Sequence, residues 1–377
     1  MAALNPFISA KRLVVKIGSA QLVDPETGEL RAKWLGALAA DIKKLHDQNV
    51  EIILVSSGAI ALGRSRLGMI GQTLSLSQKQ ACAATGQSLL TRHYEDALAA
   101  HELNTAQALL TLNDTENRRR WLNARSTLET LLGLGVVPII NENDTVSTTE
   151  IRYGDNDRLA ARTAQMLSAD TLILLSDIDG LYTQDPRNNP DAQHIDIIET
   201  IDEDIIKMGG CANQSSGVGT GGMATKLLAA QIAQRAGCHM AIMDGRELSP
   251  LSRLARGAKV TWFKATISPK NARDQWISGA INPRGTLTID SGAQAALNTG
   301  KSLLSAGVIA VEGEFEKGDT VSVINQGGEI CGHGLVAYDS VEARRIMGQK
   351  SQDAALDLGY DKVHPIIHRD NLVWDPS

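Results

Sequence analysis

Aromatic residues and cysteines are scarce in this chain of 377 residues. Phe, Trp and Tyr together supply 3% of the sequence, and the four cysteines are Cys82, Cys211, Cys238 and Cys331. These cysteines form no C-x-x-C pair, and no histidines stand at zinc-finger spacing. The sequence therefore does not predict a zinc finger, and we expect reduced, mostly buried thiols.

Long apolar runs and an excess of positive charge are also missing. The apolar run that follows Lys11 and Arg12 is interrupted at Lys16, which fits neither a signal peptide nor a membrane span. The formal net charge of −6 offers no overall attraction to nucleic acid or to anionic lipid. These absences predict a cytoplasmic protein without membrane association, in which any phosphate binding is local.

Short β-branched runs alternate with helical patterns over the first two thirds of the chain. The predicted strands are Leu13–Ile17, Glu51–Val55, Val136–Ile140, Thr171–Leu175 and Met240–Met243. The predicted helices are a stretch from Leu35 to Leu45, Gln78–Ala99, Asn117–Leu132, Asp157–Leu167 and Met223–Arg235. Strands separated by helices predict an α/β fold, a sandwich with a mainly parallel sheet.

The last quarter of the chain has a different pattern, in which short strands are separated by turn signals. The predicted strands there are Gly285–Asp290, Gly307–Val311, Thr320–Ile324 and Cys331–Ala337. This spacing is typical of a small β-barrel. We expect a large domain over residues 1–267, a linker over 268–282, a small domain over 283–362 and a C-terminal tail over 363–377.

Small polar residues follow the first two predicted strands. Lys16, Gly18 and Ser19 stand at the end of the first, and Ser57 and Gly58 stand at the end of the second. Ligands of open parallel sheets bind beyond the carboxyl ends of strands, so these residues are candidates for holding phosphate or carboxylate. An ordinary turn and a serine that only caps a helix are the alternatives.

Three clusters of Asn, Asp and Ser provide further candidates. They are Asn141–Asp144 after the third predicted strand, Gly154–Asp157 at the start of a helix, and Ser176-Asp177 after the fourth predicted strand. Carboxylates in the first two clusters can hold an ammonium group or orient lysines. Solvated turns are the alternative for all three clusters, because turns favour the same residue types.

A glycine-rich segment, Gly217–Met223, leads to Lys226. It contains G-x-G-x-x-G, but a polar stretch precedes it where a dinucleotide site needs a strand. The single Gly-Lys-Ser, at 300–302, has Ala295 where a P-loop needs glycine. We expect the segment to close over nucleotide phosphates, with Lys226 near the transferred group, although a flexible linker is an alternative.

These motifs resemble those of the bacterial glutamate 5-kinases, in which an amino-acid-kinase domain is followed by a PUA domain. The resemblance spans nearly the whole chain and is carried by VVKIGS at 14–19, SSGAI at 56–60, INEND at 140–144, GDND at 154–157, GLYTQDPR at 180–187 and GTGGMATK at 219–226. It implies an amino-acid-kinase-type sandwich that uses ATP and Mg²⁺ to make glutamyl 5-phosphate from L-glutamate, the first step of L-proline synthesis. It also implies a homo-oligomer and feedback inhibition by L-proline.

The resemblance also assigns roles to individual residues. It places Lys16, Asp157 and Lys226 in catalysis, with Asp157 orienting the two lysines, and it leaves any metal ligands unknown. It assigns ATP binding to Lys16, Ser176, Asp177, Thr220, Gly221, Gly222, Met223, Ala224, Thr225 and Lys226, and glutamate binding to Ser57, Asp144 and Asn156. Ala224 replaces a common serine and Ser176 replaces a common threonine, but neither change removes a charge.

The chemistry of the candidates agrees with this assignment. A glutamate side chain is already ionised at neutral pH, so its phosphorylation needs no general base. None of the eight histidines falls in the strand-end clusters, whereas two lysines are available to neutralise charge.

Two alternatives remain. One is an aspartate, acetylglutamate or carbamate kinase of the same fold. The other is an RNA-binding PUA protein, which the acidic balance of residues 283–362 disfavours because RNA binding calls for a basic surface.

Overall fold

The computed structural model describes residues 5–146, 155–210, 222–278, 283–359 and 364–375. The chain divides into two compact units, unit 1 (Met1–Pro269) and unit 2 (Lys270–Ser377). Of the candidate residues, Gly154, Thr220 and Gly221 lie outside the described residues, as do residues 217–219 of the glycine-rich segment.

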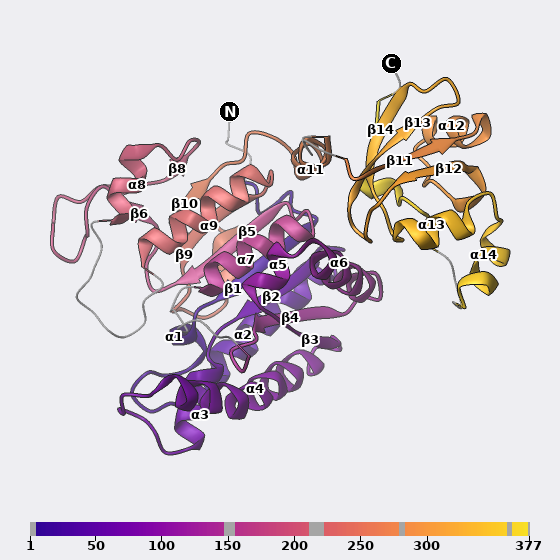
Figure 1. The fold of residues 1–377 in the computed structure, drawn as a ribbon. Coiled ribbons are helices and arrows are strands. Elements are labelled where there is room, and N and C mark those ends of the chain that lie inside the picture. Colours follow the sequence, from indigo (N-terminus) through magenta and orange to yellow (C-terminus); the bar gives the residue numbers. More distant parts are fainter. Residues whose placement is uncertain (1–4, 147–154, 211–221, 279–282, 360–363, 376–377) are drawn as a thin grey trace. The chain divides into compact units, whose positions relative to one another are not determined.

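An eight-stranded sheet forms the centre of unit 1 (Figure 1). In order across the sheet, its strands are β3 (Thr105–Leu110), β4 (Val137–Glu142), β2 (Glu51–Ser56), β1 (Arg12–Ile17), β5 (Thr171–Ser176), β9 (His239–Asp244), β10 (Val260–Phe263) and β8 (Ile197–Ile198). Every neighbouring pair is parallel except β9 and β10, which run antiparallel. The predicted α/β class with a mainly parallel sheet is therefore confirmed.

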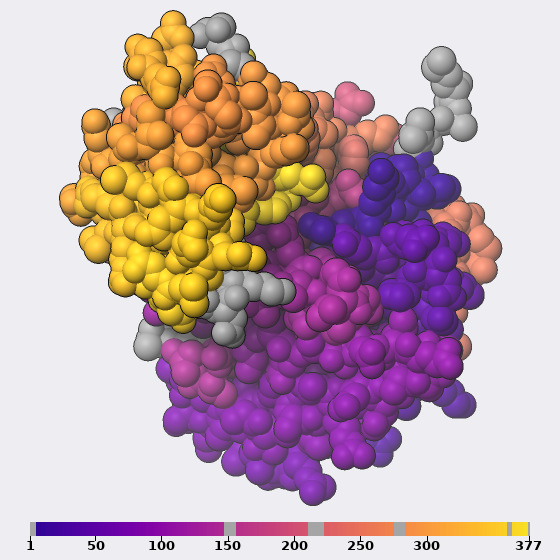
Figure 2. Space-filling view, turned by 90° about the vertical axis from the view of Figure 1, so that its right-hand side faces the viewer, coloured from indigo at the N-terminus to yellow at the C-terminus, as the bar shows by residue number. Residues whose placement is uncertain are grey.

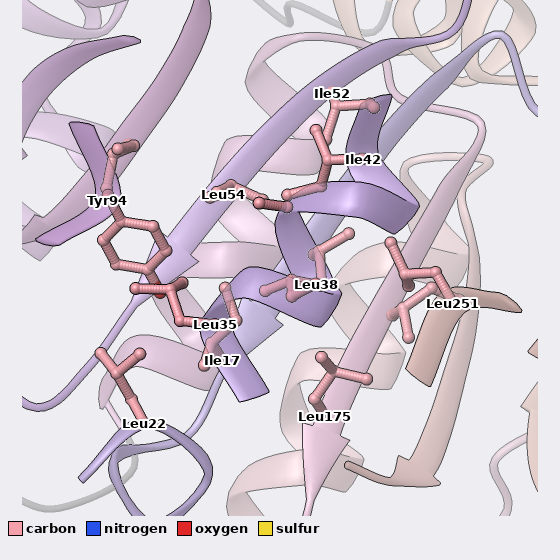
Figure 3. Packing of buried hydrophobic residues seen from close by; sticks show 14 of the residues in the cluster. Ile17, Leu22, Leu35, Leu38, Ile42, Ile52, Leu54, Tyr94, Leu175 and Leu251 are labelled. Atoms are coloured by element: carbon pink, nitrogen blue, oxygen red, sulfur yellow. The ribbon is translucent and has the colours of Figure 1, made fainter. Parts of the chain in front are cut away.

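Helices cover both faces of this sheet, which is why its inner strands are apolar throughout. Leu13 and Val15 of β1 belong to one buried cluster, whereas Val14 belongs to the cluster on the opposite face. Figure 3 shows the first cluster, where Leu35 and Leu38 pack near Ile17 and Leu54. Its helices are α2 (Ala32–His46), α4 (Leu76–Ala99) and α10 (Pro250–Ala255), and those of the second cluster are α6 (Arg118–Gly133), α7 (Asp155–Met166) and α9 (Met223–Arg235).

Smaller elements complete unit 1. They are α1 (Ser19–Leu22), α3 (Ala59–Arg66), α5 (Leu112–Glu116), α8 (Glu203–Gly210) and the hairpin of β6 (Leu181–Tyr182) with β7 (His194–Ile195). The edge strand β3 was not predicted from the sequence, because its segment TAQALL has little β-branched character and its side chains are largely half-exposed. No helix among the described residues is long and apolar enough to cross a membrane.

The strand order reverses at β1, which lies between β2 and β5. Ile17 pairs with Ser56 on one side and with Leu175 on the other, so Gly18, Ser57 and Ser176 lie level at the carboxyl edge. Ligands of open α/β sheets bind in the crevice at this kind of reversal. The topology therefore brings three of the predicted strand ends to one place.

Unit 2 contains a five-stranded sheet, and its yellow and orange residues form a compact body in Figure 2. The strands are, in order, β12 (Val308–Gly313), β11 (Gly285–Ile289), β13 (Thr320–Ile324), β14 (Ile330–Leu335) and β15 (Leu372–Trp374). The helices are α11 (Pro269–Ser278), α12 (Ser291–Asn298), α13 (Ser340–Ile346) and α14 (Ser351–Leu358), with single 3-10 turns at Ser305–Gly307 and Arg369–Asn371.

The limits of unit 2 differ from those expected from the sequence. The segment expected as a linker contains helix α11. The segment expected as a tail supplies β15, which pairs with β14, and it also supplies Ile366 and Ile367 to the core. Unit 2 therefore begins at Lys270, within the expected linker, and its sheet and core include residues of the expected tail.

Helices α3 and α4 pass each other at very short range in unit 1. A Cβ atom built on Gly86 of α4 would overlap the carbonyl oxygen of Ala59, the first residue of α3. Gly58, which precedes α3, has a φ of 112°, a backbone conformation that favours glycine. The start of α3 is therefore held between the end of β2 and α4.

We expect Gly86→Ala to lower the free energy of unfolding by about 1–3 kcal/mol, because the added methyl group meets backbone that cannot move aside. Gly36→Ala in α2 is the matched control, since a methyl group added there would have nothing within 4 Å of it. That change should raise stability by about 0.5–1 kcal/mol through helix propensity. Urea denaturation followed by circular dichroism measures both, and equal effects of the two changes would contradict the close approach.

Candidate active site

A single carboxylate joins two lysines at the carboxyl edge of the sheet. Lys16 is the fifth residue of β1, Asp157 lies in the first turn of α7, and Lys226 lies in the first turn of α9. Lys16 Nζ is 2.7 Å from Asp157 Oδ1, and Lys226 Nζ is 2.9 Å from Asp157 Oδ2. The Asp157 side chain is 0% exposed, and the side chains of Lys16 and Lys226 are 10% and 7% exposed.

Burial and the mutual attraction of these charges change their pKa values. Burial alone would raise the pKa of Asp157, but the ammonium groups of Lys16 and Lys226 outweigh it and lower this pKa to about 2. Burial lowers the pKa of Lys16 below its ordinary value, and this effect exceeds the opposing attraction of Asp157. At neutral pH the carboxylate is therefore firmly ionised, whereas the charged form of Lys16 is held at a cost.

The three groups carry one positive charge in excess, because two ammonium groups share one carboxylate. Each ammonium group contacts a different oxygen of Asp157. The arrangement is suited to holding an anion between two positioned cations in a site with little water. A purely structural ion pair would not need the second lysine.

A network of amide and hydroxyl groups lies beside this charge cluster. Asn156 Nδ2 lies 2.7 Å from Ser57 Oγ, 3.0 Å from the Ser56 carbonyl oxygen and 3.0 Å from Asn141 Oδ1. The other amide atom, Asn156 Oδ1, is buried and has no hydrogen-bond partner among the described residues. Ser57 and Asn156, both expected to bind glutamate, are thus in direct contact, and the second has an open acceptor.

Two more predicted positions belong to the other side of β1. Ser176 ends β5 and its hydroxyl donates to Asp177 Oδ1 at 3.1 Å. The Asp177 carboxylate also acts on the Lys16 ammonium electrostatically, raising the pKa of Lys16 against the larger effect of burial. Because β2 and β5 pair with opposite sides of β1, Ser176 and Ser57 lie on opposite sides of the end of β1.

The described part of the glycine-rich segment forms the start of α9. Gly222 is the N-cap residue, and the Thr225 hydroxyl donates to its carbonyl oxygen at 2.8 Å. Met223 is buried and Ala224 is exposed within the same turn. The remaining glutamate candidate, Asp144, is half-buried in the turn that follows β4, the strand that carries Asn141.

Several residues of this arrangement were not assigned a role from the sequence. Asn141 was noted only as part of a polar cluster, yet its side chain joins Asn156 to α4, where its Nδ2 donates to Gln87 Oε1 at 2.7 Å. Ser56 is bonded at 2.9 Å to the hydroxyl of Tyr94, which is fully buried. Gln87 and Tyr94 stand inside an ordinary helical pattern, and no local signal marks them.

Comparison with known proteins identifies the class to which this site belongs. Residues 11–244 match the amino acid kinase family and residues 285–355 match the PUA domain. The chain belongs to the amino acid kinase family and carries a PUA domain after it.

Within the amino acid kinase family, the chain is similar over nearly its whole length to several glutamate 5-kinases. The chain is 54% identical to a glutamate 5-kinase of Paramagnetospirillum magneticum, over 99% of this chain and 100% of that one. It is 55% identical to the glutamate 5-kinase of Caulobacter vibrioides, over 97% of each chain. It is also 55% identical to that of Brucella abortus, over 96% of this chain and 95% of the relative.

The charge cluster predicts opposite effects of two substitutions on stability. Asp157→Asn leaves two buried cations without their carboxylate, and we expect it to lower the free energy of unfolding by about 3–5 kcal/mol at pH 7. Lys16→Met leaves Lys226 paired with Asp157, so stability should stay the same or rise.

The pH dependence of the second variant provides a further check. Because the pKa of Lys16 in the folded chain lies below the 10.5 of the unfolded chain, the cost of its charge disappears as the pH rises toward that value. Any gain from Lys16→Met should therefore shrink between neutral pH and pH 10.5. Denaturation curves at several pH values measure this, and a strongly destabilised Lys16→Met would contradict the excess-cation interpretation.

Proposed function

We propose that this chain transfers the γ-phosphoryl group of ATP to the side-chain carboxylate of L-glutamate, producing L-glutamyl 5-phosphate for proline synthesis. The observation that carries the proposal is the buried pair of lysines on Asp157, at the point where the strand order reverses. The full-length similarity to glutamate 5-kinases supports glutamate as the acceptor.

The geometry suits a reaction between two anions. The glutamate carboxylate is ionised at neutral pH, so no proton has to be removed before it reacts. What opposes the reaction is the electrostatic repulsion between this carboxylate and the γ-phosphate. Lys16 and Lys226 offset that repulsion, and their effect is greatest as charge moves from the nucleotide to the acceptor. Asp157 contributes by holding both ammonium groups in fixed positions, so that little reorganisation accompanies the transfer.

The two substrates fit on opposite sides of β1. Glutamate lies toward Ser57 and Asn156, with Asp144 close to its ammonium group. ATP lies toward Ser176, Asp177 and the first turn of α9, where Met223, Ala224 and Thr225 join Lys226. The acceptor carboxylate and the γ-phosphate then meet above Gly18, beside Lys16. Thr220 and Gly221 stay predictions for nucleotide binding.

The described residues contain no group of three or more His, Cys, Asp or Glu side chains arranged to hold a metal ion. This fits Mg²⁺ carried chiefly by the phosphates of ATP, because protein sites for this ion commonly supply only one or two carboxylates. Asp177 is the carboxylate on the nucleotide side that is available to such an ion. When bound, Mg²⁺ neutralises phosphate charge in addition to the two lysines.

Other implications of the resemblance stay predictions: a homo-oligomer, inhibition by L-proline, a cytoplasmic location and the absence of RNA binding. None of them is needed for the proposed reaction.

The substrate is tested by measuring ADP release with L-glutamate, L-aspartate and N-acetyl-L-glutamate in parallel, each with ATP and Mg²⁺. We expect glutamate to give the highest kcat/KM by a wide margin. Equal or faster reaction with either of the other acids would identify a different kinase of this fold. ATP turnover that no acid stimulates would overturn the proposal as a whole.

The roles of the two lysines predict a specific kinetic defect. We expect Lys16→Met and Lys226→Met each to lower kcat by on the order of 100-fold or more at saturating ATP and glutamate, because each removes a cation that acts as charge develops. Lys43→Met is the control, since Lys43 pairs with Asp47 on the surface of α2. Either active-site variant with near-normal kcat would remove that lysine from the reaction.

A further inference from the structure

Gln87 is a half-buried residue of α4 that reaches the glutamate side of the site. The close approach at Gly86 places this part of α4 against the start of α3, and Gln87 is the next residue. Its Oε1 accepts a hydrogen bond of 2.7 Å from Asn141 Nδ2, at the end of β4. The contact joins residues 54 positions apart in the chain.

Main-chain groups fix which way the Asn141 amide points. The backbone N–H of Glu142 donates to Asn141 Oδ1 at 2.9 Å, and a backbone N–H can only donate. Asn141 Nδ2 is therefore the atom that faces Gln87, whose Oε1 must be the acceptor. The oxygen and nitrogen of this amide are thus assigned by chemistry.

The same reasoning applies to Asn156. Its Nδ2 donates to the Ser56 carbonyl oxygen at 3.0 Å, and a carbonyl oxygen can only accept. The same nitrogen lies 3.0 Å from Asn141 Oδ1. That oxygen faces Asn156 because Asn141 Nδ2 is bonded to Gln87. Asn156 Nδ2 therefore donates to Asn141 Oδ1, and Asn141 Nδ2 donates to Gln87 Oε1. The three amides form a hydrogen-bonded chain in which each nitrogen donates to the oxygen of the next residue toward Gln87.

The chain ends at Asn156 Oδ1, which is buried and has no partner among the described residues. A buried acceptor without a donor is costly, and such an atom in a substrate site is suited to a donor on the ligand. An ammonium group has three N–H donors and no acceptor, so it matches this atom. An acceptor or anion placed there would be repelled.

We propose that Gln87 is a positioning residue for the amino group of the substrate: it holds Asn141 through its Nδ2, and Asn141 Oδ1 holds Asn156 Nδ2, so that Asn156 Oδ1 stays placed to accept from the ammonium. This inference rests on the proposed function, because it takes glutamate as the ligand. Gln87 itself does not touch the substrate. Through Gln87, helix α4 also contributes to substrate affinity.

The packing of α4 does not depend on this side chain. The buried residues of the helix are Cys82, Ala83, Gly86, Leu90, Tyr94 and Leu98. Leu90, Tyr94 and Leu98 belong to the core cluster on this face of the sheet, whereas Cys82 and Gly86 lie against α3. Within the described residues, Gln87 Nε2 donates to Thr91 Oγ1 at 3.5 Å, one turn along the same helix. A substitution at Gln87 should therefore change substrate affinity with little effect on stability.

The test is Gln87→Leu, which keeps the size of the side chain and removes its acceptor. Asn141 Nδ2 then loses its partner, and the Asn141 amide keeps only the contacts of its Oδ1 with the Glu142 N–H and Asn156 Nδ2, so it is held less firmly. We expect the KM for glutamate to rise about 10-fold while kcat and the KM for ATP stay within about twofold of wild type. The melting temperature should change by only a few degrees.

Two further variants complete the experiment. Gln87→Glu keeps an acceptor oxygen and should recover most of the lost glutamate affinity. Ser88→Ala changes the neighbouring exposed residue, whose hydroxyl bonds only within its own helical turn, and serves as the matched control.

The outcomes separate this inference from the proposed function. An active wild type together with a normal glutamate KM in Gln87→Leu would overturn the inference and leave the function standing. Misfolding of Gln87→Leu, or equal losses of affinity for both substrates, would show a structural role and also overturn it. A wild type that does not phosphorylate glutamate would instead refute the proposed function, and the inference with it.

Discussion

The carboxylate of Asp157 is the constraint on which the arrangement of unit 1 depends. It binds two lysines from segments far apart in the chain, one at the end of β1 and one at the start of α9. A fully buried carboxylate needs a cation beside it, and the attraction of both ammonium groups outweighs burial and lowers its pKa to about 2. If β1, α7 and α9 were placed so that only one of these two contacts formed, the other lysine would be buried without a carboxylate beside it.

The surplus cation is unfavourable for stability, which supports the role in phosphoryl transfer that we propose for this cluster. Lys226 with Asp157 would form a complete buried pair, and the addition of Lys16 brings a charge whose burial is unfavourable. Proteins keep such an unfavourable group where a ligand compensates it, and an anionic phosphoryl group is the natural ligand here. The buried apolar clusters on both faces of the sheet stabilise the fold and offset the unfavourable burial of this charge.

The sequence predicted the elements with strong local patterns. Helix α9 was expected and found at Met223–Arg235, because Gly222 precedes it and Gly237, with a φ of 73°, follows it in the conformation that commonly ends helices. The strand ends that hold Lys16, Ser57 and Ser176 could be placed because parallel strands share an edge. The meeting of Asp157 with both lysines came from the family resemblance, and the distances support it.

Other features depend on contacts that local patterns do not encode. Strand β15 lies in a segment expected as a tail, and it is stabilised by pairing with β14 and by packing of Leu372 and Trp374 against the core of unit 2. Gln87 looks like any polar residue of a helix, and its contact with Asn141 depends on how closely α3 and α4 pass at Gly86. Such a contact is a property of packing between distant segments, so the glutamate side of the site could be predicted only in part.

In the proposed reaction, Asp157 positions two cations around the transferred phosphoryl group. The most direct measurement is a crystal structure of the chain with ADP, glutamate, Mg²⁺ and aluminium fluoride, whose planar fluoride complex mimics a phosphoryl group in transfer. The account predicts that Nζ of both Lys16 and Lys226 contacts the fluoride complex while each stays bonded to Asp157. A fluoride complex bound between ADP and glutamate without contact to Lys16 and Lys226 would contradict it.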